Sequence, residues 1–235
     1  MNTPKNLQWA RFGFEGVLIV VSILAALWID SWQADRQLAV EEQELLRQLK
    51  AEFEVNIDLL AERRSQHAAT EAAAQRLLSA TGPMPEIVDG SADILKQDML
   101  RMVQWWTFDP QTGVLIGTIQ SGKLGVVSSN RLRTKLASWP AQLQDLAEDE
   151  IFLAEFAKGS IYPLLQATTT MRNYSTIHGV EPSVFPESFE VILGSLEFEN
   201  VVTMKLAQTQ EILGIYDEIA AEIDGTLALI EKEID

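Results

Sequence analysis

Apolar residues are concentrated in one unbroken stretch near the N-terminus. No charged residue occurs from Gly16 to Ile29 (GVLIVVSILAALWI), and the apolar run from Phe12 to Trp32 is 21 residues long. As a helix this run measures about 30 Å, the thickness of the hydrocarbon core of a bilayer. We therefore predict a transmembrane helix over residues 12–32, preceded by a short tail of residues 1–11.

Two other interpretations of this stretch are a buried helix of a soluble protein and a signal peptide cleaved near Ala25-Ala26. The run is long and continues into helix-forming sequence without a break, which favours an uncleaved anchor. Lys5 and Arg11 precede the span, whereas Asp30 and Asp35 follow it. This bias places the N-terminus in the cytoplasm. We expect a protein of the bacterial inner membrane whose C-terminal part lies in the periplasm.

Several side chains in and beside the span indicate where it makes contacts. Indole rings favour the headgroup region, and three tryptophans lie near the ends of the span: Trp9, Trp28 and Trp32. Small residues permit close packing of membrane helices, and here they are Gly16, Ser22, Ala25 and Ala26. Glu15 lies about one turn inside the apolar boundary, where it either snorkels to the interface or contacts a partner helix. The small residues and Glu15 form the predicted helix contact surface, and the three tryptophans form the predicted interface belt.

The residues that follow the span predict one long helical stalk. Residues 33–80 contain no Gly or Pro and are rich in strong helix formers. Apolar residues recur at helical spacing and give one stripe: Leu38, Leu45, Leu49, Phe53, Ile57 and Leu60. The membrane helix is therefore expected to run on to residue 80, as in a coiled coil or bundle.

Residues 81–235 are predicted to form a helical bundle around this stalk. After a turn at residues 81–90, we expect helices over 91–108, 110–122 and 128–171, with kinks at Pro140 and Pro163. Residues 173–187 are expected to be irregular. The final helix, 197–235, is expected to pack on the stalk through an apolar stripe: Phe198, Val202, Ile212, Tyr216, Ile219, Ile223, Ile230 and Ile234. The predicted fold class is all-α.

Composition and charge narrow the possible functions. The chain has no cysteine, which excludes disulfides, thiolate metal sites and cysteine nucleophiles. Its net charge of −16 argues against binding nucleic acid. Residues 176–235 hold 13 acids against two bases, Lys205 and Lys232. This acidity indicates either a solvated outer face of the last helix or a face that recruits a basic partner or divalent cations.

Two stretches resemble a family of uncharacterised bacterial single-pass membrane proteins. The family has a Glu-led apolar span with an interior small residue, then Ala-Leu and a Trp; the matching positions here are Glu15, Ser22, Ala26, Leu27, Ile29 and Trp32. Phe14 stands where the family usually has Gly. Residues 108–139 resemble its Phe-x-Pro segment through Ser121-Gly122, Leu132-Arg133 and Trp139, although Pro140 departs from the pattern. The resemblance covers most of the chain and implies an anchored helical architecture, without any activity or catalytic residue.

Few residues suggest chemistry. Gly117–Lys123 resembles a phosphate-binding loop, but Leu124 replaces the residue that would hold magnesium. Of the two histidines, His67 is expected to be solvated on the stalk, and His178 lies in the longest irregular segment. The acidic group around residues 145–150 (Asp145, Glu148, Asp149 and Glu150) is expected to be a solvent face of a helix.

Trp105 and Trp106, beside Phe108, are expected to belong mainly to a bundle core. Two adjacent tryptophans on a helix cannot both face one core, however, so one of them is expected at an edge. With His178 they form a candidate surface for a partner or ligand.

The pattern favours a non-enzymatic, membrane-anchored helical protein. Its expected partners are the lipid bilayer and either itself or a larger membrane complex, as a scaffold or accessory subunit. We expect no cofactor, no metal, no nucleic acid and no small-molecule ligand. The alternative is an extracytoplasmic sensor or ligand-binding module that signals through a partner. An enzyme that uses carboxylates is a third and weaker interpretation.

Overall fold

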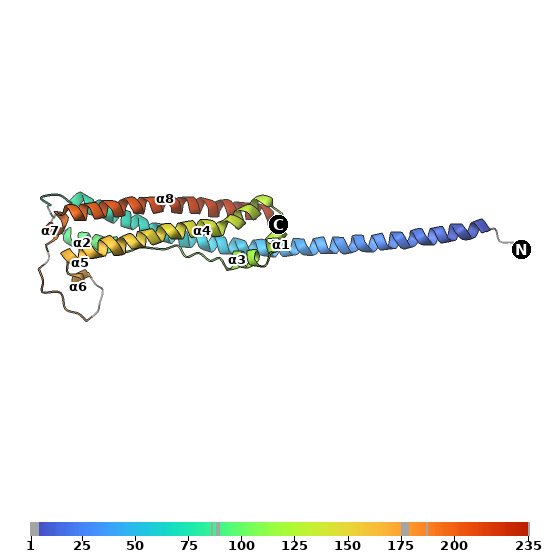
Figure 1. Cartoon of the computed structure of the whole chain (residues 1–235), viewed down its shortest axis with the longest axis horizontal. Coiled ribbons are helices and arrows are strands. Elements are labelled where there is room, and N and C mark those ends of the chain that lie inside the picture. The colour runs from blue at the N-terminus through green and yellow to red at the C-terminus, as the bar shows by residue number, and fades with distance from the viewer. Residues whose placement is uncertain (1–4, 86, 88–89, 175–178, 187, 235) are drawn as a thin grey trace.

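The computed structural model describes residues 5–85, 87, 90–174, 179–186 and 188–234. Within these residues the chain is helical and contains no strand, which confirms the predicted all-α class. Figure 1 shows an elongated bundle from which one helix, α1, extends far beyond the other elements. We call the end where α1 leaves the bundle the near end and the opposite end the far end. The C-terminal end of the chain lies at the near end.

Helix α1 (Lys5–Ala80) is 76 residues long. It is uninterrupted because residues 17–81 contain no Gly or Pro and are rich in strong helix formers. From Leu18 to Val40 every side chain is exposed, and the first fully buried one is Leu46. Leu38 was predicted to share the buried stripe of the stalk, but it is exposed because the bundle begins only beyond it.

From the far end the chain returns along α1 as an interrupted layer. It consists of α2 (Ala92–Met102), a connector of residues 103–112 that is not helical, α3 (Gly113–Gln120) and the 3₁₀ helix η1 (Lys123–Val126). The predicted helix over 91–108 is therefore wrong in its second part, because side chains of the long helices bind the connector's backbone instead. Beyond α3, Gly122 has φ 73°, a left-handed conformation that favours glycine and ends the helix.

The third layer runs back toward the far end. It comprises α4 (Asn130–Phe156), a π-helical turn η2 (Ala157–Ile161), α5 (Tyr162–Thr168) and the short α6 (Met171–Tyr174). Pro140 lies inside α4, which continues through it. Pro163 follows the π turn at the start of α5. A proline there donates no backbone hydrogen bond, and the wider turn before it accommodates that loss.

The last layer consists of α7 (Phe189–Leu193) and α8 (Leu196–Glu233), and α8 runs beside α1 toward the near end (Figure 1). The Ser195 hydroxyl accepts a hydrogen bond from the Phe198 N–H and caps α8. The predicted stripe of α8 is confirmed as buried from Phe198 to Ile230. It joins two core clusters, one toward the near end around Phe53 and Trp139 and one toward the far end around Met99 and Phe198.

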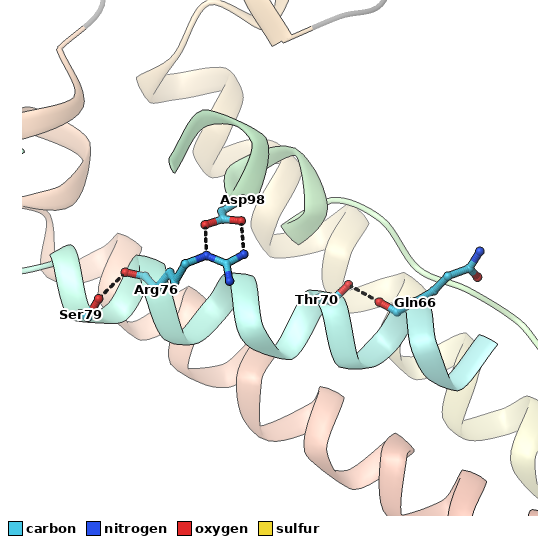
Figure 2. A network of polar contacts seen from close by, with 5 residues as sticks. All are labelled: Gln66, Thr70, Arg76, Ser79 and Asp98. Atoms are coloured by element: carbon cyan, nitrogen blue, oxygen red, sulfur yellow. Dashed lines mark hydrogen bonds and ion pairs between the residues drawn. The ribbon is translucent and has the colours of Figure 1, made fainter. Parts of the chain in front are cut away.

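An ion pair between a half-exposed guanidinium and a buried carboxylate fastens α2 to α1. Figure 2 shows the Arg76 guanidinium on α1 meeting the Asp98 carboxylate on α2 through two hydrogen bonds, of 2.8 and 2.7 Å. The Asp98 side chain is 3% exposed, whereas that of Arg76 is 48% exposed. The carboxylate is thus buried and depends on this one guanidinium, which remains in contact with water.

Candidate functional site

The first candidate site is the part of α1 that lies outside the bundle. Large apolar side chains between Leu18 and Trp32 are all more than half exposed, and Trp28 reaches 71%. This part of α1 is long and apolar enough to cross a membrane, and none of its most apolar window is buried within the structure. Elsewhere in the chain, apolar side chains of this size are mostly covered by other helices.

The predicted contact residues lie along this exposed part. Glu15, Ser22, Ala25 and Ala26 are exposed on α1, and the same helix includes Trp9 and Gly16. The Ser22 hydroxyl donates to the Leu18 carbonyl at 2.8 Å, so its polar group is satisfied within the helix. The Arg36 guanidinium lies 5.6 Å from the ring centroid of Trp32. A helix contact through these residues stays a prediction.

Where α1 enters the bundle, a groove of about 600 Å³ lies between α1 and the α3–η1 segment. We call it the near-end groove. Its lining is mixed apolar and polar: Gln37, Val40, Glu41, Glu44, Leu45 and Gln48 from α1, and Val114, Gly117, Thr118, Ser121, Lys123 and Val126 from the other side. One ion pair crosses its rim, from Lys123 Nζ to Glu41 Oε1 at 2.6 Å.

The second candidate site is a set of buried polar side chains around the connector. On α1, the Asn56 side chain forms two hydrogen bonds of 2.7 Å with the backbone N–H and carbonyl of Gln111. The Glu52 carboxylate accepts from Val114 N–H at 2.6 Å and from Leu115 N–H at 3.1 Å. Glu52 therefore caps the start of α3, where the helix dipole favours a negative charge.

His67 is buried, which corrects the expectation that it is solvated. Its side chain is 1% exposed, its Nε2 lies 3.1 Å from the Trp106 carbonyl, and its ring meets Tyr216 edge-on at 5.3 Å. Because a carbonyl only accepts, Nε2 carries the proton. Burial, aided by the charge of Lys205, lowers the pKa of His67 to about 4. The partner of this histidine is the backbone of a segment distant in sequence, which helical periodicity alone does not reveal.

Glu150 also departs from the prediction. Asp145, Glu148 and Asp149 are exposed as expected, but Glu150 is 3% exposed. Its Oε1 accepts from Phe108 N–H at 2.9 Å and from the Tyr216 hydroxyl at 2.6 Å. Burial raises the pKa of Glu150 even though these two hydrogen bonds act to lower it, and burial beside Glu150 raises the pKa of Tyr216. The carboxylate thus joins α4, α8 and the connector.

Lys205 completes this set from α8. Its side chain is almost fully buried, and Nζ donates to the Gln104 carbonyl at 3.1 Å. Burial lowers its pKa to about 8. No carboxylate pairs with it in the described part of the chain. It borders an apolar cavity of about 10 Å³ that is formed mainly by α2, α5 and α8, room for about one water molecule.

The predicted aromatic pair lies in the connector and not on a helix. Trp105 is half-buried against the far-end cluster, with the Lys158 ammonium 4.7 Å from its ring centroid. Trp106 is also half-buried, and its buried Nε1 has no hydrogen-bond partner among the described residues. His178, the third member of the predicted surface, lies outside the described residues. The structure does not bring this pair together with the contact residues of the exposed part of α1.

The buried polar residues form a cradle for the connector. Five of them, from three helices, bind backbone groups of residues 104–115: Glu52, Asn56, His67, Glu150 and Lys205. No group of three metal-binding side chains occurs among the residues that the structure describes. The stretch Gly117–Lys123 forms the end of α3 and the start of η1, with no strand before it in the described chain.

Sequence reasoning missed Glu52, Asn56 and Lys205, although a signal for two of them was present. Asn56 lies three residues after Phe53 and four before Leu60, in the middle of the buried stripe of α1. Lys205 likewise lies three residues after Val202 and on the buried stripe of α8. A polar residue on an apolar stripe indicates a buried partner.

The chain matches no protein-family model, no curated protein and no solved structure. The resemblance to bacterial single-pass membrane proteins therefore stays a prediction, and the function is argued from the geometry alone.

Proposed function

We propose that this protein is a non-enzymatic, membrane-anchored helical protein that acts as a scaffold or accessory subunit of a membrane protein assembly. One observation carries the proposal: the exposed apolar part of α1 projects from the bundle with no other element of the described chain against it. Exposed apolar surface of this extent is characteristic of a membrane or protein contact. A bilayer covers a single apolar helix of this length on all sides.

The membrane anchor also gives an orientation. Lys5 and Arg11 before the span, with Asp30 and Asp35 after it, favour an N-terminus in the cytoplasm and a bundle on the periplasmic side of a bacterial inner membrane. The bundle would then stand upright on the membrane, with its near end toward the lipid and its far end away from it.

Two features support a role in assembly over a role in chemistry. The buried polar side chains around the connector are each committed to backbone groups, which leaves them little freedom to act on a substrate. The cavity beside Lys205 is only about 10 Å³, too small for an organic ligand. What the molecule offers to others is therefore its outer surface and its membrane helix.

The first test is membrane integration of the full-length chain. Wild-type protein should remain in the membrane fraction after alkaline carbonate extraction. The double change Val20→Arg with Leu24→Arg places two charges inside the span, at about 3 kcal/mol each on insertion scales, and should release the protein. Leu38→Arg changes an equally exposed residue outside the span and should leave it membrane-bound. Wild-type protein extracted by carbonate would contradict the anchor.

The second test concerns the assembly. Native mass spectrometry of gently extracted full-length protein should show complexes larger than one chain. A monomer under all extraction conditions would contradict a scaffold or accessory role.

A further inference from the structure

The near-end groove shares one face of α1 with residues far outside the bundle. Its α1 lining includes Gln37, Val40, Glu41, Glu44 and Gln48. All five lie within about 60° of one direction on a helix that turns about 100° per residue, so they share one side of α1. Because α1 is continuous from Lys5 to Ala80, the same line can be followed down its exposed part.

On the exposed part this line passes Asp30, Ala26 and Ile19, with Ser22 and Glu15 nearer its edge. At about 100° per residue, Ile19, Ala26 and Asp30 lie within about 25° of the direction of the groove, and Glu15 and Ser22 lie within about 60° of it. Ala25, although small, lies about 120° away and belongs to another face. Small residues four positions apart, as in Ser22 and Ala26, let two membrane helices approach closely. The contact face predicted in the membrane, without Ala25, and the groove above it therefore lie on one continuous side of α1.

We propose that this surface is occupied by α1 of a second copy of the chain, in a parallel dimer with two-fold symmetry. The inference rests on the proposed membrane anchor, because the bilayer holds two α1 helices parallel and at the same height. Each copy then places its α1 in the groove of the other, and each α3 flanks the pair.

The shape of the surface restricts what can fill it. The occupant must be apolar where it lies beside Ser22 and Ala26, and it must continue past the membrane to reach the groove, whose α1 residues span about 16 Å. Only a helix unbroken across both levels fits this path. α1 is such a helix, and it presents the same residues at the same heights, as a two-fold interface requires.

The polar residues of the groove suit pairing with their own counterparts. The amides of Gln37 and Gln48 both donate and accept, so each can bond to the same residue of the other copy. Asp30, Glu41 and Glu44 would repel their counterparts; Lys123 Nζ lies 2.6 Å from Glu41 and Arg47 lies 3.9 Å from Glu44, which offsets the repulsion between the glutamates. Val40, 65% exposed in one chain, would meet an apolar neighbour.

Cysteine cross-linking tests the proposed dimer interface directly, because the chain has no cysteine of its own. Full-length Val40→Cys in native membranes should form a disulfide-linked dimer under mild oxidation. Ala39→Cys is the matched control, since Ala39 is adjacent and exposed but lies on the opposite side of α1. We expect at least fivefold more dimer from Val40→Cys. Equal yields, or cross-linking of Val40→Cys to a different protein, would overturn the proposal.

Closing the groove provides a second test. A Cβ added at Gly117 meets no atom within 4 Å, so the leucine of Gly117→Leu starts from open space in the lining of the groove. Gly214→Leu on α8 has equally open surroundings and lies outside the groove. In detergent, Gly117→Leu should lower the dimer fraction at least fivefold, whereas Gly214→Leu should match wild type. A Gly117→Leu protein as dimeric as wild type would refute the proposed dimer interface.

Carbonate extraction of the same membranes separates the two levels of the argument. Protein that stays in the membrane but shows no preferential Val40→Cys cross-link refutes the dimer and leaves the anchor intact. Protein that is extracted by carbonate refutes the anchor and, with it, the dimer built upon it.

Discussion

The two parts of α1 have the same secondary structure but opposite relations to their surroundings. Between Leu18 and Val40 the helix exposes every side chain, including its largest apolar ones. From Leu46 to Leu77 it buries apolar side chains on one face against the rest of the bundle. No break in the backbone separates the two parts. Up to Trp32 the first part is long and apolar enough to cross a membrane, whereas the second packs against other helices.

The polar side chains of the two parts also differ in where their hydrogen-bond partners lie. In the exposed part, the hydroxyls of Ser22 and Ser31 donate to carbonyls of their own helix. In the bundled part, Asn56 and His67 bond to the backbone of the connector and Glu52 bonds to that of α3, at least 39 residues away in sequence. These two hydroxyls are satisfied within α1, whereas the three bundled side chains bond to other segments of the chain.

Truncation of a core side chain should separate the two parts most strongly. Phe53 is 1% exposed, and its ring lies 5.3 Å from that of Trp139. Phe53→Ala removes this packing and leaves a cavity, so we expect the free energy of unfolding to fall by about 4 kcal/mol. Leu38→Ala, on the exposed part, should change it by less than about 0.5 kcal/mol. Urea unfolding of the full-length chain in detergent, followed by circular dichroism, measures both values.

If Leu38→Ala destabilised the chain as much as Phe53→Ala, residue 38 would be covered in solution. The boundary between the exposed and the bundled part of α1 would then lie before Leu38 and not near Val40.

The ion pair of the buried Asp98 carboxylate gives a second, smaller contrast in the free energy of unfolding. Arg76→Ala leaves the nearly buried Asp98 carboxylate without a cation and should cost about 3 kcal/mol. Arg64→Ala is the control: Arg64 also lies on α1 and binds Asp217 through two hydrogen bonds, but both partners are about half exposed. An exposed pair should contribute less than about 1 kcal/mol. Equal losses in the two variants would show that burial of Asp98 has no energetic consequence.

Much of the architecture could be predicted because it follows from periodicity. The apolar run before Trp32, the helix-forming residues up to Ala80 and the stripe from Phe198 to Ile230 each have one consistent spacing, and each predicted its element. Local signals sufficed because each of these elements has an apolar or helix-forming pattern of its own.

The connector could not be predicted for the opposite reason. Residues 103–108 have no helix breaker, so local propensity favoured a helix there. The helix ends because His67, Glu150 and Lys205 offer hydrogen bonds to the extended backbone, and these residues come from three different helices. The expected exposure of His67 and Glu150 was wrong for the same reason. Tertiary hydrogen bonds decided both outcomes, and they leave no regular pattern in one sequence.

The smallest contrast concerns the pH dependence of stability, to which His67 contributes in the bundled part of α1. Its pKa is about 4 in the folded chain, against about 6.5 when unfolded. The unfolded chain therefore binds more protons between these values, and the contribution of His67 to stability is lost as the pH falls from about 6.5 to 4. From pH 7 to 5 this loss amounts to about 2 kcal/mol.

Glu150 acts in the opposite sense, because its pKa is raised in the folded chain and its protonated form favours folding. The difference between wild type and a His67→Gln variant isolates the histidine, since glutamine can still donate to the Trp106 carbonyl but does not titrate. Urea unfolding at a series of pH values should show wild type losing about 2 kcal/mol more than His67→Gln between pH 7 and 5. Parallel curves would mean that His67 keeps its ordinary pKa, and hence that water reaches the connector in the folded bundle.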